Sequence, residues 1–101
     1  MKKEYNMKIY FKHSYRCPIS LRAKREMDRF LENNADNRDF DFELIDVVDN
    51  RNRSREVAEQ FGISHESPQI IIADNNNRVL WEASHGSITE EAIKKVIDKN
   101  K

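Results

Sequence analysis

Patterns typical of strands and of helices alternate along this chain, and the alternation limits the folds that it can adopt. Residues 7–12 alternate apolar and polar side chains, which predicts a short strand. Pro18 suits the first turn of a helix, because its missing N–H removes no hydrogen bond there. Apolar side chains then recur about every 3.6 residues, which predicts a helix over residues 18–31 with one buried stripe. The stripe consists of Ile19, Ala23, Met27, Phe30 and Leu31.

Later elements follow the same order and end in a hairpin and a helix. Residues 40–48 predict a second, largely buried strand, and residues 52–61 predict a helix that stops at Gly62. Residues 69–73 and 78–82 predict a hairpin around an asparagine-rich turn, and Thr89 is the expected cap of a last helix. The order βαβαββα predicts one α/β domain over residues 1–101, with a four-stranded mixed sheet flanked by helices.

Composition excludes several classes of partner. The 101 residues include 18 basic and 18 acidic side chains, so no bulk charge attracts nucleic acid or an anionic lipid surface. No apolar run approaches the ~18 residues of a membrane span, and the first residues lack the apolar stretch of a secretory signal. A single cysteine cannot form an internal disulfide. We therefore expect a cytoplasmic protein without nucleic-acid or membrane partners.

The single cysteine lies where the first strand passes into the first helix. At that position Cys17 meets the unpaired N–H groups of a helix start, which favour the thiolate over the thiol. Pro18, the Ser20 hydroxyl and the positive charge of Arg16 are the neighbours expected to help stabilise it. The motif Cys-Pro-x-Ser resembles a redox Cys-Pro-x-Cys pair whose second sulfur is replaced by a hydroxyl. Such a site can attack a disulfide but cannot close one within itself; the alternative is a buried cysteine that acts as a small hydrophobe.

Three histidines accompany the cysteine: His13, His65 and His85. Each could carry a proton near neutral pH, but surface or loop positions without a catalytic role are the ordinary expectation. His13 is the best functional candidate, because it lies four residues before Cys17. One cysteine and three scattered histidines lack the paired spacing of zinc ligands, so no metal site is expected.

Taken together, these motifs resemble the monothiol bacilliredoxin family over nearly the whole chain. The residues that carry the resemblance are the run from Lys12 to Arg16, then Cys17-Pro18-Ile19-Ser20, and later Ser67-Pro68-Gln69. The family form has a threonine before the cysteine, where this chain has Arg16. The resemblance implies a minimal thioredoxin-like fold. It also implies that Pro68 is cis beside the reactive sulfur, with Ser67 offering its backbone to substrate.

The resemblance implies a reaction as well. Cys17 would be the catalytic nucleophile that attacks the mixed disulfide between a client protein and bacillithiol, with Ser67 and Pro68 contacting substrate. From its position near Cys17, we expect His13 to contact substrate as well. Bacillithiol would be a low-molecular-weight thiol co-substrate rather than a bound cofactor. The partners would be S-bacillithiolated client proteins and bacillithiol itself, and we expect a monomer.

Other functions remain open at this stage. An iron–sulfur monothiol glutaredoxin would have Cys-Gly-Phe-Ser and a Gly-Gly pair, whereas this chain has Cys-Pro-Ile-Ser and the single Gly86. A cysteine phosphatase needs Cys-x5-Arg, but Ala23 stands six positions after Cys17. An arsenate-reductase-like or transcription-interacting protein of the same fold, or a non-catalytic adaptor with a structural Cys17, are the remaining alternatives.

Overall fold

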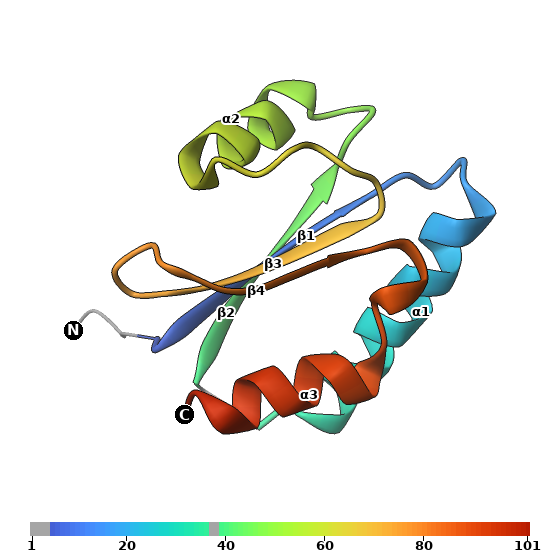
Figure 1. Cartoon of the computed structure of the whole chain (residues 1–101). Helices are drawn as coiled ribbons and strands as arrows, with labels where there is room; N and C mark the ends of the chain where they lie inside the picture. The colour runs from blue at the N-terminus through green and yellow to red at the C-terminus, as the bar shows by residue number, and fades with distance from the viewer. Residues whose placement is uncertain (1–4, 37–38) are drawn as a thin grey trace.

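The computed structural model describes residues 5–36 and 39–101, and in this part of the chain four strands form one mixed sheet covered by helices (Figure 1). The elements are β1 (Met7–His13), α1 (Pro18–Asn33), β2 (Phe40–Asp46), α2 (Arg51–Phe61), β3 (Gln69–Asp74), β4 (Val79–Ser84), the short 3-10 helix η1 (His85–Ser87) and α3 (Glu90–Lys99). No helix among these residues is long and apolar enough to cross a membrane.

The sheet has the strand order β2-β1-β3-β4. β1 pairs parallel with β2 and antiparallel with β3, and β3 pairs antiparallel with β4. A crossover helix connects the parallel pair, and a tight turn connects the last two strands. The predicted α/β class and the order βαβαββα are confirmed.

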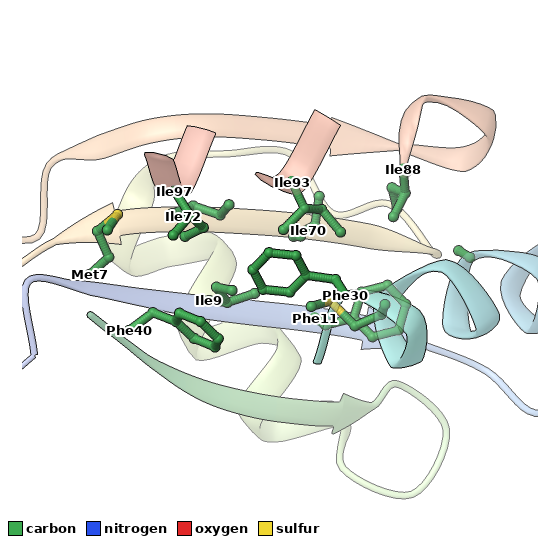
Figure 2. Packing of buried hydrophobic residues seen from close by; sticks show 12 residues of the cluster. Met7, Ile9, Phe11, Phe30, Phe40, Ile70, Ile72, Ile88, Ile93 and Ile97 are labelled. Carbon is green, nitrogen blue, oxygen red and sulfur yellow. The ribbon is translucent and has the colours of Figure 1, made fainter. Parts of the chain in front are cut away.

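Side chains from opposite faces of the sheet form two apolar clusters, because successive residues of a strand point to opposite sides. The larger cluster lies between the sheet and the helices α1 and α3; Figure 2 shows Phe30 of α1 and Ile93 and Ile97 of α3 packed over the strands. The smaller cluster lies under α2 and includes Val57 and Ile71. The two faces are therefore covered by different helices, as Figure 1 also shows.

β1 is buried more completely than its alternating sequence indicates. Lys12 and His13 are both fully buried, although Lys12 is a polar residue of the alternating pattern and we expected a surface or loop position for His13. The reason is topological: β1 lies between β2 and β3 and has a helical layer on each side. Only Lys8, near the start of the strand, is partly exposed among the residues of β1.

β2 is less buried than predicted, and it ends at Asp46 rather than at residue 48. Leu44 is exposed because β2 is an edge strand with a neighbour on one side, and Val48 is exposed in the turn that follows the strand. Ile19 is also 52% exposed, although we placed it in the buried stripe of α1. It lies in the first turn of α1, and this end of the helix lies past the ends of the strands (Figure 1).

The signals that end or cap helices are confirmed. Gly62 follows α2 in the left-handed conformation with φ 63°, which glycine adopts without steric cost. The Thr89 side chain accepts a hydrogen bond from the N–H of Ala92 and caps α3. η1 was not predicted; it places His85 at φ 54° directly after β4.

Candidate functional site

Four connecting segments meet at one end of the sheet. Strand register places His13, the last residue of β1, beside Asp46 at the end of β2, and Lys12 beside Gln69 at the start of β3. Gln69 in turn pairs with Ser84 at the end of β4. The segments 14–17, 47–50, 62–68 and 85–87 therefore share this end, which is where ligands reach open α/β sheets.

Cys17 is the N-cap residue of α1, and Pro18 is the first residue of the helix. The Cys17 carbonyl accepts the N–H of Leu21 at 3.0 Å, while its side chain makes no capping hydrogen bond within the described residues. The residue is partly buried, so the thiol is neither sealed in the core nor fully exposed. As N-cap residue, Cys17 lies at the end of α1 where the first backbone N–H groups have no partner within the helix.

The loop that carries Cys17, residues 14–17, is stabilised by two serine side chains. The fully buried Ser20 hydroxyl accepts the N–H of Ser14 at 2.9 Å, and the Ser14 hydroxyl accepts the N–H of Arg16 at 3.2 Å. We expected the Ser20 hydroxyl to help stabilise the thiolate, and this stays a prediction. The structure shows that the same hydroxyl accepts the Ser14 N–H and so helps to hold the loop that carries Cys17.

A small pocket adjoins the same loop. It has a volume of about 140 Å³ and is lined by Ser14, Tyr15, Arg16, Asp46, Val48 and Asp49. The Asp46 carboxylate accepts the N–H groups of Asp49 and Val48, which lowers the pKa of Asp46. Arg16 is exposed and lines this pocket together with Asp46, so the pocket beside the Cys17 loop has one positive and one negative side chain in its wall.

His13 lies beneath the exposed Tyr15, with their ring centroids 4.3 Å apart and edge-on. The Phe11 ring also stacks with His13, with the ring centroids 5.8 Å apart. Both ring nitrogens are buried without a hydrogen-bond partner among the described residues. Burial lowers the pKa of His13, and the charge of Lys24 lowers it further, against Asp46 and Asp28. His13 is therefore neutral near pH 7, and its buried ring is not accessible to a substrate in this conformation.

The Ser67–Pro68 peptide bond is cis, as the resemblance implied. Pro68 is buried, and its carbonyl accepts the N–H of His85 at 3.1 Å, which joins the start of β3 to the end of β4. The Ser67 hydroxyl is buried without a hydrogen-bond partner in the described chain. The His85 ring nitrogen Nε2 also lies 3.7 Å from the Glu66 carboxylate, so these two side chains lie near the proline.

The sequence did not indicate that Lys12 is a buried residue in contact with His65. Its ammonium nitrogen lies 3.3 Å from Nδ1 of His65, and the Ser54 hydroxyl lies 3.2 Å from the same atom. Burial lowers the pKa of Lys12, and burial together with Lys12 lowers the pKa of His65. The order of the elements could have indicated this burial, because a central first strand with helices on both faces of the sheet has little access to solvent. Among residues 5–36 and 39–101, no group of three His, Cys, Asp or Glu is arranged to hold a metal ion.

Comparison with known proteins agrees with this geometry. The sequence profile of the family described as monothiol bacilliredoxin BrxC matches residues 1–93. A solved thioredoxin-fold protein described as a candidate oxidoreductase is 30% identical, with a TM-score of 0.78 over 90% of this chain and 77% of that one.

Two more distant structures share the fold. Thioredoxin-2 of the malaria parasite is 15% identical with a TM-score of 0.75, over 97% of this chain and 86% of that one. Trichomonas vaginalis thioredoxin is 21% identical with a TM-score of 0.68, over 95% and 80% of the two chains. The fold is thioredoxin-like, and the family match together with the 30% identical structure supports a thiol oxidoreductase role.

Proposed function

Because this chain belongs to the monothiol bacilliredoxin family, we propose that it removes bacillithiol from protein mixed disulfides through Cys17. The observation that carries the proposal is a lone, partly buried thiol at the N-cap of α1, in a chain without a second cysteine. A single thiol of this kind needs an outside thiol to complete each cycle.

The proposed reaction has two exchange steps. The Cys17 thiolate attacks the bacillithiol sulfur of the mixed disulfide, so that one S–S bond forms and the other breaks. The client cysteine leaves as a thiolate and takes a proton, and bacillithiol stays on Cys17. A second bacillithiol thiolate then attacks the adduct, which yields oxidised bacillithiol and regenerates the Cys17 thiolate.

The neighbours of Cys17 have separate parts in this proposal. Pro18 starts the helix whose N–H groups stabilise the thiolate, Ser20 holds the loop through Ser14, and Arg16 supplies positive charge. Ser67 and Pro68 present backbone groups to the extended substrate, and His13 contacts it once Tyr15 has moved. The protein would act as a monomer in the cytoplasm, on S-bacillithiolated clients and with no bound cofactor.

Intact-mass spectrometry of a bacillithiolated client protein tests the proposal. The wild-type chain with free bacillithiol should release the client thiol, and an adduct of one bacillithiol should be detected on Cys17. The Cys17→Ser variant should reduce release to background, because a hydroxyl does not attack a disulfide at neutral pH.

Two controls make the result specific. Unchanged circular dichroism of Cys17→Ser would show that the fold is intact, and a glutathionylated client would test which thiol is preferred. Release by the folded Cys17→Ser variant at the wild-type rate would refute the mechanism.

A further inference from the structure

A larger pocket lies between α2 and the loop that leads to Pro68. It has a volume of about 340 Å³ and is lined by Arg51, Ser54, Arg55, Ala58, Glu59 and His65; we call it the α2 pocket. Cys17 is not among these residues. The α2 pocket is thus separate from the small pocket beside the Cys17 loop, although His65 lies only two residues before Ser67.

The inner wall of the α2 pocket is backed by a buried amine. His65 Nδ1 contacts both Lys12 Nζ and Ser54 Oγ, and Lys12 is 0% exposed. Within the described residues, no carboxylate lies within ion-pair distance of Lys12. A buried amine without a counter-anion is costly when charged, so this wall favours the approach of a negative group.

The rim of the α2 pocket carries two exposed arginines. Arg51 and Arg55 are exposed, lie one turn apart on the same face of α2, and form no ion pair in the part of the chain that the structure describes. Arg53, on another face of the helix, is by contrast paired with Glu43 through two hydrogen bonds. Like charges one turn apart destabilise a helix slightly, and an anion between them removes that cost.

We propose that the α2 pocket binds a small molecule through a carboxylate or phosphate group, held by Arg51 and Arg55 with Lys12 and His65 behind it. Arginine is suited to this because its planar guanidinium donates two parallel hydrogen bonds to either group. Glu59 is the one acidic residue of the lining, so the positive side chains outnumber it. The aliphatic stems of the arginines and Ala58 provide apolar contact for the rest of the ligand.

NMR titration of the Cys17→Ser protein with inorganic phosphate tests the α2 pocket without any thiol chemistry. At constant ionic strength, saturable shifts are expected for the amides of Ser54, Arg55 and His65. The double variant Arg51→Gln/Arg55→Gln should weaken binding roughly tenfold or more, since two charged hydrogen-bond donors are lost. The matched control Arg22→Gln/Arg25→Gln removes two exposed arginines from α1 and should bind phosphate as the parent does.

A second titration, with reduced bacillithiol, distinguishes two sources of the anionic group. Displacement of phosphate by bacillithiol, lost in the Arg51→Gln/Arg55→Gln variant, would support the carboxylates of that thiol as the occupant. Phosphate binding that bacillithiol does not displace would support a free anion. Equal phosphate affinity of the two double variants, or no saturable shift at the lining residues with either probe, would overturn the proposal. Because Cys17 is absent, failure of the exchange chemistry would not affect this outcome.

Discussion

At the scale of single residues, His13 shows how burial sets a pH dependence. Its folded-state pKa lies below the ordinary 6.5, because burial disfavours the charged ring and Lys24 of α1 adds to the effect. Asp28 of α1 and Asp46 of β2 oppose the shift but do not reverse it. As the pH falls below 6.5, the unfolded chain binds a proton at His13 more readily than the folded chain does. The free energy of unfolding therefore decreases as the pH is lowered.

In the His13→Phe variant, the free energy of unfolding should decrease less as the pH is lowered than it does in the wild type. Phenylalanine keeps the ring contacts with Phe11 and Tyr15 and removes two buried nitrogens without hydrogen-bond partners, so its stability near neutral pH should equal or exceed that of the wild type. Urea unfolding between about pH 8 and about pH 5 measures both effects. The exposed His85→Gln variant is the control, and an identical pH slope for wild type and His13→Phe would contradict the prediction.

At the scale of elements, Glu43 connects β2 to its neighbours. Its carboxylate accepts two hydrogen bonds from Arg53 of α2, at 2.7 and 2.8 Å, and lies 3.1 Å from Lys8 of β1. The hydrogen bonds from Arg53 are the main cause that lowers the pKa of Glu43 to about 2. Since the folded-state pKa is lowered from 4.5, this contribution is complete above pH 4.5 and is lost as the pH falls toward 2.

We expect Glu43→Gln to lower the free energy of unfolding by about 1 kcal/mol near neutral pH, because the site is partly exposed and water screens the pair. The loss should become smaller under acidic conditions, where the wild-type carboxylate is protonated. Glu56→Gln is a matched control, since Glu56 contacts the same Arg53 at 3.3 Å but is 66% exposed. A loss from Glu56→Gln as large as that from Glu43→Gln would show that the bidentate geometry is unimportant.

At the scale of the whole molecule, the two apolar clusters share one sheet. Ile70 and Ile72 of β3 point to the α1 and α3 side, while Ile71 points to the α2 side. We expect the two layers to unfold together, because each depends on the same central strands. Ile93→Val should lower stability by about 0.5–1.5 kcal/mol, and Val57→Ala should lower it by about 2 kcal/mol through lost methyl groups and the cavity left behind.

Fluorescence of the single tryptophan, Trp81, and far-UV circular dichroism measure this cooperativity. Trp81 packs against the larger cluster, whereas Val57 belongs to the smaller cluster on the other face of the sheet. In the Val57→Ala variant, Trp81 fluorescence therefore reports on the layer that the substitution does not touch. Coincident transitions by both probes are expected for each variant. A Trp81 transition that Val57→Ala leaves at its wild-type midpoint would show that the α2 layer unfolds separately.

Local signals in the sequence were sufficient for much of the fold. Pro18 at the start of α1, Gly62 at the end of α2 and the Thr89 cap each act within a few residues, and each is where the sequence predicts it. Burial was harder to predict where it depends on distant neighbours. Ile19 and Leu44 belong to apolar patterns in the sequence, yet both side chains are exposed to solvent. Lys12 is a polar residue, yet it is fully buried.

The candidate site divides in the same way. Cys17 at a helix start follows from the residues around it, because a proline and a change of periodicity mark the junction without reference to the rest of the chain. Only the tertiary structure brings Pro68 to the same end of the sheet, buries His13 under Tyr15, and places Lys12 behind His65 at the α2 pocket. The contact of Lys12 with His65 and the place of Pro68 join residues that are far apart in sequence. The burial of His13 depends on β1 lying in the middle of the sheet. Local backbone preferences contain no information about distant neighbours or about strand order.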